Sequence, residues 1–477
     1  MTTRLQTDTS LLPFLRQTLS RAAARSHLPS VLLAASVLAL GGCGGGSSTG
    51  IGNANAAVNA EEPEASAPDT GDPTAKAWVY RGVKIHDEDI RQYTWERTVG
   101  KGPYDKIAVH RFVREPNNKD AIPNRPAPDK RKVLFGVTGT WGQGGPRQLI
   151  EEYDAHFFPK HGYDYWTMDF RTSYVPNLAP HQFEEYGELQ GLKSIGNWTY
   201  DVFREDIKLA VELAKKISRA DKVFMSGRSR GGTQLYMYAA KYSQDLKGMI
   251  GLDGGPIYRG VDDPSQQRSK KEFKQALEAF RNGNPENLVS EVSSYGDGQL
   301  AGAIPSAEAA YGRELPSANE LPYGPPRDGL GIRDITDLAA YDTYYVWGEG
   351  MVSNVYGAHP NGGTYMDKDN LVLGRQAYTR YWPEVQNLEA SFLAGYADNP
   401  YLDYDDTKHV VVPVIHFNSE FSCLNGSCLS SDRPYSVGSD DVTVIYLEGY
   451  GHVDVYYGRH AIEDVKKPML NWMNARL

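Results

Sequence analysis

Residues 222–240 read Lys222-Val-Phe-Met-Ser-Gly-Arg-Ser229-Arg-Gly-Gly-Thr-Gln-Leu-Tyr-Met-Tyr-Ala-Ala240. The stretch begins with an apolar run of strand length, passes through Gly-x-Ser-x-Gly-Gly, and continues with apolar residues at helical spacing. A serine in this context lies at the tip of a sharp turn, where its hydroxyl projects from the backbone and the next N–H groups point into the same space. Gly227 and Gly231 must be small, because a side chain on either would collide where the chain doubles back. We therefore predict that Ser229 is a nucleophile on a strand–turn–helix elbow.

The same five-residue pattern occurs a second time, at Gly46-Ser-Ser-Thr-Gly50. That copy lies in a Gly/Ser run with no strand before it and no helix after it. Since the elbow needs both flanks, we interpret this second match as linker.

Composition sets the class of protein. The chain has 477 residues, 40% of them hydrophobic, which suffices for a large core. Its net charge of −10 is spread along the sequence, so nothing favours nucleic acid as a partner. The oligomeric state does not follow from these features.

The first 76 residues are expected to lie outside the folded domain. A basic region leads into an apolar run that is too short to span a bilayer and ends at Leu40-Gly-Gly-Cys43. This ending resembles the lipobox of bacterial lipoproteins, which implies a signal peptide over 1–42 and a lipid on Cys43. Residues 43–76 are poor in groups to bury and read as a flexible tether. The protein is thus expected to be exported and to be held at a bacterial membrane by its lipid alone. The expected membrane is the outer membrane, on either its periplasmic or its surface face. An ordinary signal peptide with a stray cysteine is the alternative.

Two further cysteines, Cys423 and Cys428, form a candidate disulfide in an exported protein. Two free thiols are the alternative. No second Cys/His pair has zinc-ligand spacing, so no metal site is expected.

Strands and helices alternate along much of the chain. Apolar stretches of strand character lie near 90–98, 106–113, 132–138, 163–170, 248–252, 410–417 and 442–447, and amphipathic helices are predicted at 200–218, 270–281 and 461–473, the last with a possible kink at Pro468. This alternation predicts an α/β fold with a mostly parallel, doubly wound sheet. Between 257 and 407 we find no clear buried strand. We therefore predict a core of residues 77–256 and 408–477, with 257–407 inserted as a cap.

A glycine-rich turn, Gly139-Thr-Trp-Gly-Gln-Gly-Gly145, follows the predicted strand at 132–138. Such a turn at the carboxyl end of a central strand is expected to present unpaired backbone N–H groups. A phosphate-binding loop is the competing interpretation, but no Gly-Lys-Ser/Thr follows.

A serine nucleophile needs a base within hydrogen-bonding reach and an acid to orient that base. His452 follows the strand at 442–447 in Glu-Gly-Tyr-Gly-His, and Glu420 follows the strand at 411–417. Asp253, at the end of the strand after the elbow, is the alternative acid. His416 is interpreted as a satisfied residue near a strand end.

The sequence resembles the serine branch of the α/β-hydrolase superfamily. The resemblance lies in the elbow at Ser229, the glycine-rich turn before it, the acid that follows the elbow in the sequence, and the pattern Gly-x-Gly-His near the carboxyl end. The resemblance implies Ser229 as nucleophile, His452 as general base and Glu420 as the orienting carboxylate. It also implies an oxyanion hole from the backbone N–H groups of Arg230 and Thr140, and it requires no cofactor. Thr138 departs from the histidine that many members have before the glycine, and the acid is Glu where Asp is commoner.

The implied chemistry is hydrolysis of a small-molecule or polymer ester through an acyl-enzyme. Nine aromatic residues of the insertion could favour an aromatic or sugar-bearing ester, or could pack the cap itself: Tyr341, Tyr344, Tyr345, Trp347, Tyr356, Tyr365, Tyr378, Tyr381 and Trp382. Arg228 and Arg230 could attract an acidic substrate, or could pair with local carboxylates. A peptidase or acyltransferase of the same fold, and a non-catalytic binding lipoprotein, are the alternative functions.

Overall fold

The residues that the computed structural model describes all lie within one compact unit. The described residues are 77–86, 89–115, 120–140, 142–145, 153–176, 178, 182–255, 270–291, 379, 381–393, 406–420, 437–448, 450, 454–458 and 460–477. Among these residues, no helix is both long and apolar enough to cross a membrane.

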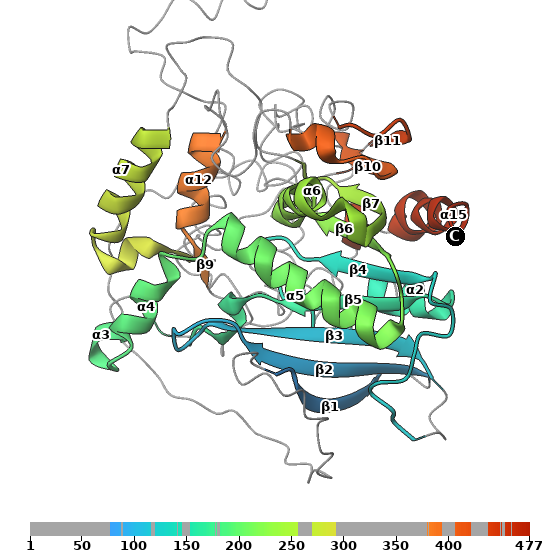
Figure 1. Ribbon diagram of the computed structural model, residues 1–477, viewed down its shortest axis with the longest axis horizontal. Coiled ribbons are helices and arrows are strands. Elements are labelled where there is room, and N and C mark those ends of the chain that lie inside the picture. Colours follow the sequence, from blue (N-terminus) through green and yellow to red (C-terminus); the bar gives the residue numbers. More distant parts are fainter. Residues whose placement is uncertain are drawn as a thin grey trace, which may run out of the picture. The chain divides into compact units, whose positions relative to one another are not determined.

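A nine-stranded sheet forms the centre of this unit (Figure 1). Its strand order is β1-β2-β3-β5-β4-β6-β7-β10-β11. The six strands from β5 to β11 run parallel, whereas β1, β2 and β3 are antiparallel to their neighbours. The predicted fold class is therefore confirmed. The strands are β1 (Val79–His86), β2 (Ile90–Thr98), β3 (Lys106–Arg114), β4 (Val133–Val137), β5 (Asp164–Asp169), β6 (Val223–Arg228), β7 (Leu246–Leu252), β10 (Val414–Ser419) and β11 (Val442–Leu447).

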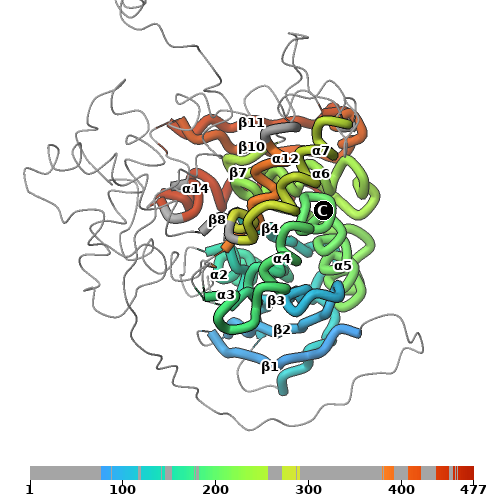
Figure 2. Tube along the Cα trace, turned by 90° about the vertical axis from the view of Figure 1, so that its left-hand side faces the viewer, coloured from blue at the N-terminus to red at the C-terminus, as the bar shows by residue number. Residues whose placement is uncertain are grey.

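Helices cover both faces of the sheet, so its central strands are buried on both sides. Alternate residues of each strand join different cores: Phe135 and Met225 pack on the face of α5 and α6, and Leu134 and Phe224 pack on the face of α2, α14 and α15. Figure 2 shows α5 on one side of the sheet and α2 and α14 on the other. The α-helices are α2 (Asp154–Lys160), α3 (Gln182–Glu185), α4 (Leu189–Ile195), α5 (Tyr200–Ser218), α6 (Arg230–Tyr242), α7 (Lys270–Arg281), α12 (Val385–Leu393), α14 (Asp454–Tyr457) and α15 (Lys467–Asn474).

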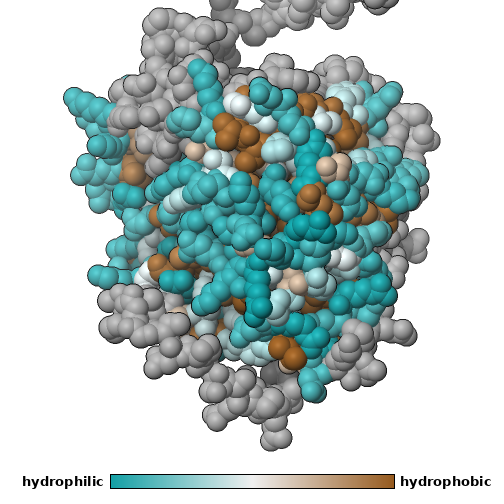
Figure 3. All heavy atoms as spheres, turned by 45° about the vertical axis from the view of Figure 1, so that its right-hand side comes forward, coloured by the Kyte–Doolittle hydropathy of each residue, from teal (hydrophilic) through white to brown (hydrophobic). Residues whose placement is uncertain are grey.

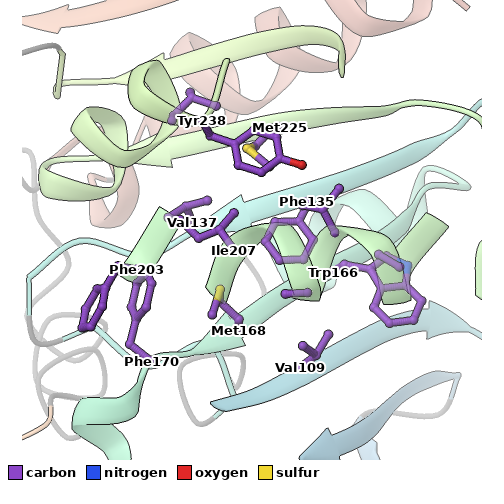
Figure 4. Packing of buried hydrophobic residues seen from close by; sticks show 14 of the residues in the cluster. Val109, Phe135, Val137, Trp166, Met168, Phe170, Phe203, Ile207, Met225 and Tyr238 are labelled. Atoms are coloured by element: carbon purple, nitrogen blue, oxygen red, sulfur yellow. The ribbon is translucent and has the colours of Figure 1, made fainter. Parts of the chain in front are cut away.

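Helix α5 shows how the local sequence sets an element. The Thr199 side chain accepts a hydrogen bond from the Val202 N–H at the amino end, and the helix ends at Arg219, which is left-handed with φ 56°. The apolar face of α5 packs against β3, β4 and β5, and Phe203 stacks on Phe170, just after β5, with ring centroids 4.6 Å apart (Figure 4). On the face of the molecule drawn in Figure 3, hydrophilic side chains make up most of the described surface and hydrophobic atoms form small separate patches.

The elements between the two parts of the sheet differ in part from the sequence prediction. Helix α7 has the predicted bounds, but the predicted absence of buried strands is wrong, because β8 (Val289–Glu291) pairs with β9 (Tyr381–Pro383), whose residues are all buried. Helix α7 packs against α12 (Figure 1). All described strands of the main sheet lie within 79–252 and 414–447. The division into core and cap remains a prediction.

The last helix is also built differently from the prediction. A π-helical turn (Ile462–Lys466) leads into α15, and Pro468 lies in the first turn of α15. Pro468 has no N–H, so an ordinary α-helical turn would also lack a hydrogen bond at this position. The wider π-helical turn therefore loses little by comparison.

Candidate active site

Ser229 lies between β6 and α6 in a strained backbone conformation. Its φ of 50° and ψ of −126° fall outside the regions that residues with a side chain normally adopt. Backbone hydrogen bonds hold it there: the Ser229 N–H donates to the Leu252 carbonyl at 3.1 Å, and the Gly232 N–H donates to the Ser229 carbonyl at 2.9 Å. Such strain costs about 1–3 kcal/mol and persists only where the surroundings impose it. The side chain of Ser229 is half-buried.

Glycines make room for this turn. A Cβ on Gly227 would lie 2.3 Å from the carbonyl oxygen of Gly231, and a Cβ on Gly231 would lie 2.5 Å from that of Val137. Both contacts are with backbone atoms, which cannot swing aside. Gly227 and Gly231 therefore have the steric role that the sequence predicts.

The loop after β4 passes directly beside the serine. A Cβ on Gly139 would lie 3.1 Å from the Cβ of Ser229. Within the described part of the chain, the N–H of Thr140 has no hydrogen-bond acceptor, and neither has the N–H of Arg230 at the start of α6. These two donors border the space around Ser229.

The other N–H groups of this loop are less available than expected. The Gly142 N–H donates to the Gly139 carbonyl at 3.0 Å, and those of Gly144 and Gly145 donate to Asp169 Oδ1 at 2.5 and 3.1 Å. The expected unpaired donors are thus found at Thr140 but not at Gly142, Gly144 or Gly145. Asp169 is the last residue of β5, and these two hydrogen bonds hold the carboxyl-terminal end of the loop in place.

Asp169 itself is held as a carboxylate. His110 Nε2 lies 2.9 Å from its Oδ2. Burial alone would raise the pKa of Asp169, but His110 and the two glycine N–H donors outweigh burial and lower it. A charged acceptor is thus maintained at the end of the loop.

The two candidate acids follow β7 and β10, which are neighbouring parallel strands. Asp253 follows β7 with φ 46°, and Glu420 follows β10 and is half-buried. Both carboxylate oxygens of Asp253 accept from Ser419: Oδ1 from its N–H at 3.0 Å and Oδ2 from its hydroxyl at 2.7 Å. Asp253 therefore braces the strand end that carries Glu420.

The element that follows the predicted base reaches the same edge of the sheet. Helix α14 begins two residues after His452 in the sequence, and the Tyr456 hydroxyl donates to the Leu252 carbonyl at 2.9 Å. That carbonyl is also the acceptor for the Ser229 N–H. One backbone oxygen thus joins the elbow to α14.

Several predicted residues lie outside the described part of the chain. They are His452, the lipidation candidate Cys43, the disulfide candidates Cys423 and Cys428, and the aromatic residues Tyr341, Tyr344, Tyr345, Trp347, Tyr356, Tyr365 and Tyr378. Tyr381 and Trp382 are described, and both are buried in β9 against the core, where Trp382 meets Phe170 and Phe203 edge-on. These two aromatic residues pack the scaffold.

The side chain of Arg230 turns toward α12 and β9. It is 5% exposed, its Nη2 donates to Asn387 Oδ1 of α12 at 2.6 Å, and its guanidinium lies 5.8 Å from the Trp382 ring and 5.9 Å from the Tyr200 ring. Glu389 of α12 also accepts from the Tyr200 N–H, at 2.8 Å. Helix α12, which lies within the predicted insertion, is therefore packed against the residue that follows Ser229.

His416 is buried in the middle of β10, not at its end. Its Nδ1 lies 3.1 Å from the Tyr236 hydroxyl, whereas its Nε2 has no partner in the described residues. The interpretation of a fully satisfied histidine is therefore wrong. Burial lowers the pKa of His416 to about 4, and the carboxylate of Asp253 offsets this effect only in part.

This histidine should make the fold sensitive to acid. Its pKa is about 4 in the folded state and 6.5 when exposed, so the unfolded chain binds the proton first and stability falls as the pH drops from 6.5 to 4. By pH 4 the loss is about 2–3 kcal/mol. We expect His416→Gln to remove this part of the decline, measured by urea unfolding between pH 7 and pH 4. The exposed His409→Gln is the control, and an unchanged decline in His416→Gln would contradict the assignment.

Among the described residues, no three His, Cys, Asp or Glu side chains converge in a way that could hold a metal ion. The elbow offers a half-buried hydroxyl and two backbone N–H donors, and the two candidate carboxylates follow β7 and β10.

No protein-family model and no curated protein sequence matches the chain. Among solved structures, the fold is similar to that of a candidate lipase from Sulfolobus solfataricus, with 21% identity, a TM-score of 0.54, and coverage of 84% of this chain and 99% of that one. A thermostable carboxyl esterase from Bacillus coagulans is more distant, with 13% identity, a TM-score of 0.40 and coverage of 84% and 99%. The strand order, the elbow after β6 and the similarity to the Sulfolobus structure together show that the chain has the α/β-hydrolase fold.

Proposed function

We propose that the protein is a serine hydrolase that cleaves carboxylic esters through an acyl-enzyme on Ser229. The observation that carries the proposal is the strained, half-buried Ser229 beside the acceptor-free N–H groups of Thr140 and Arg230. Strain of this kind concentrates at functional sites. A serine that only connected a strand to a helix would gain nothing from it. The candidate lipase with the same fold is in keeping with an ester substrate.

The reaction has two halves. The Ser229 hydroxyl attacks the ester carbonyl and gives its proton to His452, and the resulting oxyanion accepts from the N–H groups of Arg230 and Thr140. Collapse breaks the bond to the alcohol, which leaves with the proton from His452. Water then attacks the acyl-enzyme with His452 as base, and the acid product is released with Ser229 restored.

Glu420 is the proposed partner that orients His452. Its rival, Asp253, already accepts two hydrogen bonds from Ser419, which suits a bracing role at the end of β10. Glu420 is the next residue and is positioned by that brace. The proposal also includes export and anchoring through a lipid on Cys43, which rests on the sequence alone.

Ser229→Ala is the direct test of the nucleophile. We expect the wild-type protein to be labelled by a fluorophosphonate probe and to hydrolyse p-nitrophenyl acetate, and the variant to lose both. Ser226→Ala, which changes a buried serine in β6 just before the elbow, is the matched control and should retain labelling. Transfer of the acyl group to an added amine or alcohol in place of water would indicate an acyltransferase, and cleavage of amides over esters a peptidase. A folded wild type that is neither labelled nor active would favour a binding protein.

Activity and melting temperature together should distinguish the roles of Glu420 and Asp253. Glu420→Gln removes the charge that stabilises the protonated base, so we expect kcat to fall by about 100-fold or more with a nearly native melting temperature. Asp253→Asn weakens the brace of Ser419, so it should lower the melting temperature as well. The reverse pattern, with full activity in Glu420→Gln, would transfer the role to Asp253.

Asp169 tests the glycine-rich loop. Asp169→Asn removes the charged acceptor of the Gly144 and Gly145 N–H groups, so the Thr140 donor at the other end of the loop should lose its fixed position. Removing one oxyanion donor typically costs about 100- to 1,000-fold in kcat, and we expect a smaller loss, about tenfold, with KM little changed. A rise in KM at constant kcat would argue against this role. Asp221→Asn, an exposed carboxylate before β6, is the control.

A further inference from the structure

Arg228 and Arg230 flank the proposed nucleophile, and their side chains pack against different elements. Arg230 is buried against β9 and α12, as described above. Arg228 is half-buried, and its guanidinium lies 4.7 Å from the centre of the Tyr456 ring of α14. Only Arg228 of this pair remains within reach of solvent.

Arg228 lies at the edge of the reaction space. A Cβ placed on Gly139 would be 3.7 Å from Arg228 Cγ and 3.1 Å from Ser229 Cβ. The stem of Arg228 therefore starts beside the serine and the loop that carries the Thr140 N–H. Its guanidinium ends over α14, the helix that follows the His452 segment.

Among the side chains that the structure describes, no carboxylate pairs with the charge of Arg228. Arg171 shows the contrast, because its Nε and Nη2 donate to the two oxygens of Asp206 at 2.6 and 2.8 Å. A guanidinium that stacks on an aromatic ring keeps its in-plane N–H donors available for another partner, and no described side chain or backbone group accepts from those of Arg228. Those donors match a carboxylate, which a planar arginine recognises through two parallel hydrogen bonds.

We infer that Arg228 binds a free carboxylate on the substrate, so that the preferred esters are acidic molecules with a carboxylate near the scissile carbonyl. This inference rests on the proposed ester hydrolysis. It names Arg228 as the residue that determines specificity, and Tyr456 as the ring that holds its guanidinium in place.

The test compares esters that differ only in that charge. One pair carries the carboxylate on the acyl side: mono-p-nitrophenyl adipate and its methyl-capped diester. The other carries it on the alcohol side: meta-acetoxybenzoate and its methyl ester. For at least one pair, we expect the wild type to favour the acidic member about tenfold or more in kcat/KM.

Arg228→Gln should abolish that preference, and Arg228→Lys should keep part of it, since lysine retains the charge without the planar fork. Lys222→Gln removes the same charge from the exposed amino end of β6 and should leave the preference as it is in the wild type. Equal hydrolysis of both members of both pairs by the wild type would overturn the inference, as would an unchanged preference in folded Arg228→Gln. These results leave the ester hydrolase itself standing, whereas wild-type protein that cleaves none of the four esters and takes no fluorophosphonate label would refute the proposed function.

Discussion

The strained, positive-φ backbone of Ser229 is the constraint on which the rest of the site depends. A residue with a side chain adopts this conformation only where the surrounding structure imposes it, at a cost of about 1–3 kcal/mol. Both sides of the turn impose it here: β6 is fixed in the sheet between β4 and β7, and α6 starts immediately after the serine. The Ser229 N–H is tied to Leu252 at the end of β7. Gly227 and Gly231 allow the two arms of the turn to approach within backbone contact.

The same sheet edge gathers the other groups because parallel strands end together. Leu252 carries a carbonyl that accepts from Ser229 and from Tyr456 of α14. Asp253, the next residue, holds Ser419 at the end of β10, beside Glu420. Asp169 ends β5 and fastens the glycine-rich loop from the other direction. Each brace crosses from one strand end to another, so the strained turn is surrounded by fixed backbone.

The sequence predicts those parts whose cause is local. Helix α5 could be predicted to the residue, because its apolar period and its Thr199 cap both lie within the helix and its first flank. The elbow was recognisable for the same reason. By contrast, β1 was missed, because it is an edge strand with exposed residues and shows no apolar run. The pair of β8 and the buried β9 was missed because its strands are three residues each and about 90 positions apart in sequence.

Side-chain partners distant in sequence could not be predicted at all. The pattern Gly139–Gly145 suggests free donors, but whether they are free depends on Asp169, on another strand. Likewise, the choice between two acids gains its physical argument only from the contact of Asp253 with Ser419, which is 166 residues away. Arg228 and Arg230 look alike in the sequence, and only the packing of Trp382 and Tyr456 distinguishes them.

A crystal structure of the protein after reaction with a small fluorophosphonate would test the central claim most directly. We expect a covalent bond from phosphorus to the Oγ of Ser229, with the phosphoryl oxygen accepting hydrogen bonds from the N–H groups of Arg230 and Thr140. We also expect the φ of Ser229 to stay positive. Phosphorus bound to another residue, or a phosphoryl oxygen directed away from both N–H groups, would contradict it.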